Sequence, residues 1–262
     1  MATGIPSRVY KVINSIYKFL PYTRRYGTAL YDWYLRGYMT YMRVMHCNPG
    51  PHVGISDRQL LYVDPDNIER ANDPGFFFKL GSDCDVLGSN WDTDLPRFED
   101  TFPYNAFEEH FIENEPWEET EMYDFLEDMF EAGRSWGGYT SFPEAHERLD
   151  DIDALHDNIR RNGYKTQREI QMNECDSPIG TPDWLMDRPP EDHEIAVDIG
   201  RNGEIIFEDG RHRLAIAKVL DLDTVPVQVV VRHSMWQQRR EEVAENPEAY
   251  QDVSHPDLRN LI

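Results

Sequence analysis

Apolar and polar positions in the last third of the chain follow strand and helix periods in turn. Residues 204–207 and 225–231 are short apolar runs of strand type, and residues 194–199 alternate as a half-buried strand does. Residues 211–221 have helical composition and apolar positions at 3.6-residue spacing. Gly200–Gly203 has the composition of a hairpin turn. This region therefore predicts strand, hairpin, strand, helix and strand in succession.

The preceding residues predict mainly helices. Apolar spacing indicates helices near 104–113 and 118–131, with Thr120 as a cap for the second. Residues 143–162 predict a longer helix that ends at Gly163, because asparagine followed by glycine is a typical C-cap. The other expected elements are strands at 60–63 and 76–78, a short helical turn near 65–67, a proline-rich loop at 173–191 and a helix in the first half of the tail from residue 236.

One junction between strand and helix carries an unusual set of polar residues, Asp209-Gly210-Arg211-His212-Arg213. Asp209 and Gly210 both suit the N-cap region of the helix that follows. The first turn of a helix has free backbone N–H groups and the positive end of the helix dipole. Two arginines and a histidine at the same place favour an anion, most naturally a phosphate.

Charge separates the first fifty residues from the rest. The formal net charge is −23, yet residues 1–50 hold seven basic residues and one acidic residue, Asp32. Only five of the 26 basic residues are lysines. Acid excess with scarce lysine resembles proteins from halophiles that accumulate salt, although an acidic mesophile protein that avoids nucleic acid has the same character. In molar salt the Debye length is about 3 Å, so only close charge contacts keep their strength.

The basic segment predicts a helical arm. Residues 8–46 read as one or two amphipathic helices rich in tyrosine, with Met39, Met42 and Met45 at regular spacing. Three roles remain open for the arm: packing on the rest of the protein, lying on a membrane surface, or docking to nucleic acid or another partner. The predicted organisation is an arm at 1–50, a domain at 51–235 with an acidic insertion near 82–145, and a polar tail at 236–262.

Composition also bears on where the protein is located and on whether its cysteines could bind zinc. The sequence contains no run of eighteen apolar residues, so no transmembrane helix is expected. Basic residues near the start interrupt the apolar core that a signal peptide would need. A cytoplasmic protein is expected, with peripheral membrane association as the alternative. The cysteines are far apart and lack the CxxC spacing of a zinc site: Cys47, Cys84 and Cys175.

The order of motifs resembles the ParB/sulfiredoxin superfamily domain. The resemblance rests on Val63–Ile68, Leu155–Gly163, the Asp209–Ala217 motif with its hairpin, and Val225–Val229. It covers residues of about 58–70 and 150–232, and it implies an α+β fold in which helices pack on a mixed sheet. The acidic residues near 82–145 would then be a large helical insertion, and the N-terminal arm an addition.

In that superfamily the equivalent turn and helix start hold nucleotide phosphates. The resemblance therefore implies Gly210, Arg211, His212 and Arg213 as phosphate ligands, with ATP, ADP or CTP as the nucleotide and Mg²⁺ as an accompanying ion. Arginine suits bidentate phosphate binding. Asp209 either caps the helix or binds magnesium. His212 either donates to the phosphate or is a buried, satisfied histidine.

The sequence departs from known branches of this superfamily, and the departures narrow the activities that the resemblance implies. Arg211 stands where sulfiredoxins have their reactive cysteine, so the repair chemistry lacks its nucleophile. Chromosome-partition members continue into a helix-turn-helix region, and only about thirty residues follow Val231. The acidic body also argues against nucleic-acid binding. Free-serine kinases share the Asp-Gly-x-His-Arg turn and use a carboxylate as general base, for which the candidates here are Glu69, Asp92, Asp94 and Glu169.

Asp92 is the first choice for that base, because an acid beside a large apolar ring such as Trp91 can have a raised pKa; a turn-capping role is the alternative. The function expected from the sequence is phosphate or nucleotide binding at residues 209–213, with phosphotransfer or nucleotide hydrolysis as the reaction if there is turnover. The alternative is a non-catalytic switch module that docks through the basic arm to a membrane surface or partner protein. A DNA-associated nuclease ranks last, since no metal-binding acid cluster is evident.

Overall fold

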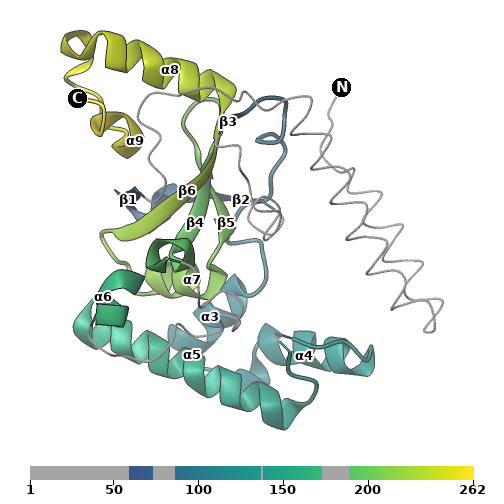
Figure 1. The fold of residues 1–262 in the computed structure, drawn as a ribbon. Coiled ribbons are helices and arrows are strands. Elements are labelled where there is room, and N and C mark those ends of the chain that lie inside the picture. Colours follow the sequence, from purple (N-terminus) through teal and green to yellow (C-terminus); the bar gives the residue numbers. More distant parts are fainter. Residues whose placement is uncertain (1–58, 73–85, 137, 173–188) are drawn as a thin grey trace.

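A mixed sheet forms the centre of the protein (Figure 1). The computed structural model describes residues 59–72, 86–136, 138–172 and 189–262. The strands run in the order β1-β6-β4-β5-β2, and β3 also pairs with β6. Their bounds are β1 (Leu60–Val63), β2 (Arg70–Ala71), β3 (Val86–Leu87), β4 (Ile195–Ile199), β5 (Ile205–Asp209) and β6 (Val225–His233). The expected combination of helices with a mixed sheet is confirmed.

The predicted hairpin links the central strands. β4 and β5 pair in antiparallel fashion, and the turn between them closes when Gly200 N–H donates to the carbonyl of Glu204 at 2.9 Å. β4 pairs with β6 in parallel on its other side. The helix α7 (Arg211–Val219) therefore crosses β4 to connect β5 with β6. This crossing fixes where the first turn of α7 lies, directly after the end of β5.

The helices expected near 104–113, 118–131, 143–162 and in the tail begin and end close to the predicted residues. The helices at 167–172 and 256–259 were not expected. Thr120 caps α4, since its hydroxyl accepts from Met122 N–H at 3.3 Å. Gly163 ends α5 with φ of 75° and donates to the carbonyl of Ile159. The bounds are η2 (Pro65–Asn67), α3 (Tyr104–Phe111), η4 (Trp117–Glu119), α4 (Glu121–Glu131), α5 (Phe142–Asn162), α6 (Gln167–Met172), η6 (Pro190–His193), α8 (Ser234–Glu245), η7 (Pro247–Tyr250) and α9 (Pro256–Arg259).

One apolar core joins the sheet, α7 and the acidic segment. The apolar residues Leu214–Ala217 of α7 are fully buried on the sheet face that carries Val197 and Phe207. The same core includes residues that the sequence assigned to the insertion: Phe98, Phe107, Trp117, Met122 and Leu126. Lys218 ties the far end of α7 to this segment, because its Nζ donates to Glu99 at 2.8 Å. The acidic segment is therefore packed against the domain.

The C-terminal residues are also packed, although they are polar. α8 and α9 lie toward the opposite end of the sheet from α3, α5 and α7 (Figure 1). Asp257 is buried, and it accepts hydrogen bonds from Arg232 at 2.8 Å and from Trp236 Nε1 at 2.9 Å. Arg240 is buried beside the same carboxylate. Paired charges therefore replace apolar contacts in this part of the interior.

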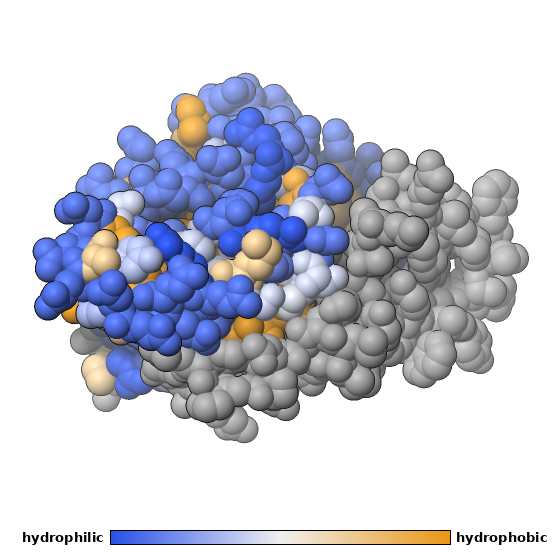
Figure 2. Space-filling view, turned by 90° about the horizontal axis from the view of Figure 1, so that it is seen from above, coloured by the Kyte–Doolittle hydropathy of each residue, from blue (hydrophilic) through white to orange (hydrophobic). Residues whose placement is uncertain are grey.

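Several expectations fall outside the described residues: the arm at 8–46, the strand at 76–78 and most of the loop at 173–191. In the part of the chain that is described, no helix combines the length and apolar character needed to cross a membrane. The face in Figure 2 is mostly hydrophilic where residues are described, with small scattered apolar areas. This surface agrees with the net charge of −23.

Candidate anion site

The first turn of α7 begins at a glycine that no other residue could replace without strain. Gly210 has φ of 90°, and a Cβ added there would lie 3.0 Å from Cα of Ile195. Asp209 accepts from Gly210 N–H at 2.8 Å, but no side chain caps the helix itself. The expected capping role of Asp209 is therefore wrong. The N-cap residue is thus Gly210, which has no side chain with which to cap the first turn of α7.

The two motif arginines have different neighbours. Nη1 of Arg211 donates to the carbonyl of Phe102, and its guanidinium carbon lies 5.5 Å from the centre of the Phe207 ring. Arg213 folds back toward Gly210, where an added Cβ would lie 3.5 Å from its Nη2. Nη1 of Arg213 is 3.7 Å from Oε2 of Glu194, which is close enough for charge attraction but too long for a hydrogen bond.

His212 is neutral at physiological pH. Burial, followed by the positive charges of Arg148, Arg211 and Arg213, lowers the pKa of His212 to about 3. Its ring stacks on Phe107 with centroids 5.8 Å apart and meets the edge of Trp136 at 6.1 Å. A neutral imidazole carries one N–H donor. Both expected roles, a donor to phosphate and a packed histidine, are compatible with this position.

The structure adds one arginine that the motif does not contain. Arg148 of α5 is only 8% exposed, and its charge lowers the pKa of His212. Within the described parts of the chain, no carboxylate lies within ion-pair distance of its guanidinium. Burial lowers the pKa of Arg148, while the more distant charges of Tyr139 and Asp151 raise it. The sequence held a signal, because Arg148 lies on the same helical stripe as the buried residues Ala145, Leu149 and Ile152.

These residues form what we call the anion corner: Arg148, Gly210, Arg211, His212 and Arg213. The charges of Arg148, Arg211 and Arg213 all lower the pKa of His212, which lies in the first turn of α7 at the positive end of the helix dipole. Like charges gathered in a partly buried place repel one another, and an anion between them reverses the sign of that interaction. The positive charges and the N-terminus of α7 therefore favour a phosphate, sulfate or carboxylate at this place.

Asp92 lies away from the anion corner. Its carboxylate accepts from the side chain and backbone of Arg201, in the turn before β5, whereas α7 follows the end of β5. A strand of this length spans roughly 16 Å at about 3.3 Å per residue. Burial alone would raise the pKa of Asp92, but the hydrogen bonds from Arg201 lower it. The expected raised pKa is therefore wrong.

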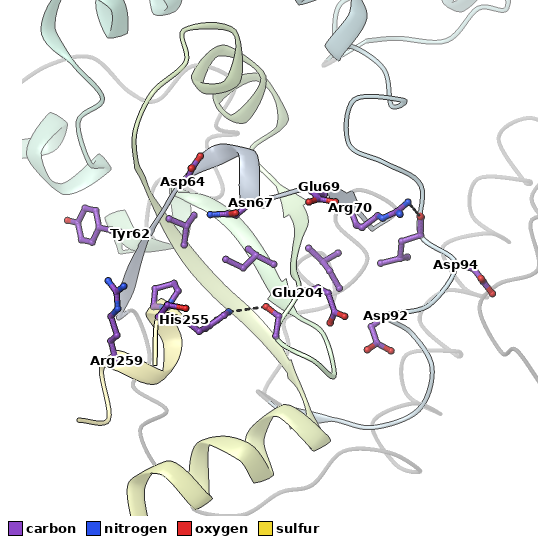
Figure 3. A pocket seen from close by; sticks show the side chains of 17 residues that line it. Tyr62, Asp64, Asn67, Glu69, Arg70, Asp92, Asp94, Glu204, His255 and Arg259 are labelled. Carbon is purple, nitrogen blue, oxygen red and sulfur yellow. Dashed lines mark hydrogen bonds between the residues drawn. The ribbon is translucent and has the colours of Figure 1, made fainter. Parts of the chain in front are cut away.

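Two other candidate bases lie with Asp92 around a hollow of about 970 Å³ (Figure 3). Glu69 directly precedes β2, Asp94 lies on the segment after β3, and Glu204 precedes β5. The hollow is thus acidic and lies at the opposite end of β5 from the anion corner. Glu169, the fourth candidate, is exposed and accepts from the backbone and hydroxyl of Thr166 at 2.8 Å, which makes it part of a capping box.

Two carboxylates do lie beside the anion corner, the exposed Asp209 and the buried Glu194. Glu194 was not expected from the sequence. Burial raises the pKa of Glu194 to about 7, despite hydrogen bonding from Gln167 N–H and attraction by Arg213. In the described residues, no group of three or more His, Cys, Asp or Glu side chains could hold a metal ion. A magnesium role for Asp209 remains a prediction.

Comparison with known proteins adds no relative. No protein-family model matches the chain, and neither the curated proteins nor the solved structures gave a match.

Proposed function

We propose that this chain binds a phosphate group at the anion corner, as an inorganic anion or as part of a nucleotide. We further propose that residues 51–235 form a domain of the ParB/sulfiredoxin type. The support is the order of β4, hairpin, β5, the Asp209–Arg213 turn, α7 and β6, which follows the order of the resembling motifs.

The buried Arg148, which has no ion pair among the described residues and is attracted only through space by Asp151, carries the proposal. Removing an ion from water without a counter-ion costs several kcal/mol, so a buried and unpaired arginine lowers stability. The N-terminus of α7 alone would be a weak argument, because every helix has one. A buried cation on another helix whose charge acts on His212 of the same turn is an independent feature, and a bound anion would offset the desolvation of both.

The proposed ligand set follows from the donor geometry. Arg213 and Arg148 would contact the phosphate oxygens, His212 would donate one neutral hydrogen bond, and the N–H groups after Gly210 would complete the site. ATP, ADP and CTP, with or without Mg²⁺, are the nucleotides to test. In a phosphotransferase or nucleotide hydrolase, the same arginines would neutralise charge on the transferred group.

The test is a titration by calorimetry in molar KCl with sulfate, inorganic phosphate and the three nucleotides. We expect Arg148→Met to weaken anion affinity at least tenfold, which corresponds to about 1.4 kcal/mol. The same substitution should stabilise the anion-free protein by about 1–3 kcal/mol, because it removes a buried charge that has no ion pair among the described residues. Loss of binding in a more stable protein separates a ligand role from unfolding.

Arg160→Met is the matched control, since Arg160 lies on the same helix and its side chain is 57% exposed. Its anion affinity should equal that of the wild type. Equal affinity in Arg148→Met and the wild type would overturn the proposal. Release of inorganic phosphate from a bound nucleotide would then distinguish an enzyme from a binding module.

A further inference from the structure

Several buried polar atoms meet beneath Arg213. Glu194, just before β4, has a side chain that is 1% exposed. Its Oε1 accepts from Gln167 N–H at 2.6 Å, and its Oε2 has no hydrogen-bond partner among the described residues. In the same set of residues, Nη1 of Arg213 and the hydroxyl of Tyr164 also lack a partner. The contact of 3.7 Å between Arg213 and Glu194 is therefore incomplete on both sides.

The charges that face Glu194 are unevenly balanced. Arg213 of α7 attracts the carboxylate, whereas Glu191 of η6 and Glu169 of α6 repel it. Tyr164 is neutral, because burial raises its pKa to about 12. His193 precedes Glu194 in the chain and is also buried. Arg213 is therefore the cation on which the ionised form of Glu194 depends.

We propose that Glu194 takes up a proton when an anion binds at the anion corner, so that anion binding and proton binding are coupled. This inference rests on the proposed function. A bound anion and Glu194 would compete for the guanidinium of Arg213. When the anion recruits Arg213, the buried carboxylate loses its cation and gains a negative neighbour. A proton from solvent then forms an O–H bond at Oε2, and the net charge of the buried cluster changes little.

The other groups of the anion corner do not titrate near neutrality. The pKa of His212 is about 3, and the arginines stay charged. The pKa of Glu194 is about 7 in the structure without an anion. Anion affinity should therefore be constant below that value and fall as pH rises above it, by up to roughly tenfold per pH unit for one coupled proton.

Sulfate is the appropriate probe, because phosphate groups change their own protonation near neutrality. Titration of the full chain by calorimetry at about pH 8, in buffers of different ionisation enthalpy, gives the number of protons taken up, which we expect to approach one. At about pH 5.5 the uptake should be near zero, because Glu194 is already protonated.

Glu194→Gln places a neutral amide in the same volume. It should bind sulfate with no proton uptake, and at about pH 8 it should bind several-fold more tightly than the wild type. His193→Gln is the matched control for the neighbouring histidine, and its proton uptake should equal that of the wild type. The wild-type measurement decides the proposal even where the variant fails to fold.

The outcomes separate the two proposals. Sulfate binding whose affinity does not change with pH, without proton uptake, overturns the coupling and leaves the anion corner intact. Absence of sulfate binding at every pH overturns both the coupling and the proposed function. Proton uptake that persists in Glu194→Gln overturns the assignment of the proton to Glu194.

Discussion

Arg201 binds the carboxylate of Asp92 through both its guanidinium and its backbone N–H. Its Nη2 lies 2.6 Å from Oδ1, its Nε lies 2.9 Å from Oδ2, and its backbone N–H donates to Oδ2 at 2.8 Å. The same guanidinium donates to the carbonyl of Ser89 and to the side chain of Asn90. Asp92 thus fastens the β4–β5 hairpin to the segment that follows β3.

Asp92→Asn should lower stability and leave anion binding unchanged. Because the folded pKa of Asp92 is lowered, the carboxylate contributes stability above its unfolded pKa of 3.8, and this contribution is lost as pH falls toward the folded pKa. We expect a loss of about 1–3 kcal/mol near neutral pH, measured by denaturant unfolding. Asp94→Asn, on an exposed residue of the same segment, should cost far less. Lost sulfate affinity in Asp92→Asn would contradict this structural role.

Glu208→Gln should stabilise the protein at high pH. Asp198 and Glu208 are buried side by side in the sheet, and burial, followed by the charge of Glu208, raises the pKa of Asp198 well above 3.8. A raised folded pKa gives stability that is complete at low pH and is lost as pH rises through that pKa. The variant removes one buried charge, so we expect a gain of about 1–3 kcal/mol at about pH 8.

The measurement is the denaturant midpoint of the wild type and of Glu208→Gln, from acidic pH to about pH 8. The two curves should converge in acid and diverge in base. If the wild type is more stable at every pH and the two curves are parallel, ionisation of Asp198 and Glu208 does not destabilise the fold.

Gly210→Ala should destabilise the fold more than Gly138→Ala. Both glycines have positive φ, 90° and 98°, so both variants suffer a similar backbone cost of about 1–2 kcal/mol. An added Cβ at Gly210 also approaches Ile195 Cα to 3.0 Å, whereas nothing lies within 4 Å at Gly138. The difference in melting temperature between the variants measures this close approach. Equal melting temperatures would mean that β4 can shift to admit the methyl group.

Asp257→Ala should be among the most damaging substitutions in the described residues. It leaves Arg232 and Arg240 buried without their shared carboxylate, and truncation of one partner in a buried charge pair costs about 3–5 kcal/mol. Asp252→Ala, on an exposed residue nearby, should change the unfolding free energy by less than about 0.5 kcal/mol. A mild effect at Asp257 would indicate that water replaces the carboxylate.

The elements that sequence reasoning located well depend on neighbours in the chain. The hairpin at 200–203, the cap at Thr120 and the end of α5 at Gly163 all follow from residues within four positions of one another. The apolar positions of α7 likewise reflect burial on one face. Local geometry fixes these features, so the sequence alone suffices for them. Every residue of β4 is buried, so the expectation of a half-buried strand at 194–199 is wrong, because α7 and the flanking strands cover it.

The features that sequence reasoning misplaced depend on distant partners. Asp92 meets Arg201 across 109 residues, and this pairing reverses the direction of pKa shift expected from Trp91 alone. Arg148 and Glu194 reach the anion corner from other elements, and no motif joins them to residues 209–213. The polar C-terminal residues are buried because Asp257 and two arginines neutralise one another, which composition does not reveal.

An anion held by Arg148 and the first turn of α7 would join α5 to the sheet without a covalent bond. The chain between these contacts is about sixty residues long, a loop whose closure would restrict many conformations if it were permanent. A disulfide at such a position acts on the unfolded chain as well, whereas an anion leaves on unfolding and strengthens only the native state. The stability of the packing between α5 and the sheet would then rise and fall with the concentration of the anion.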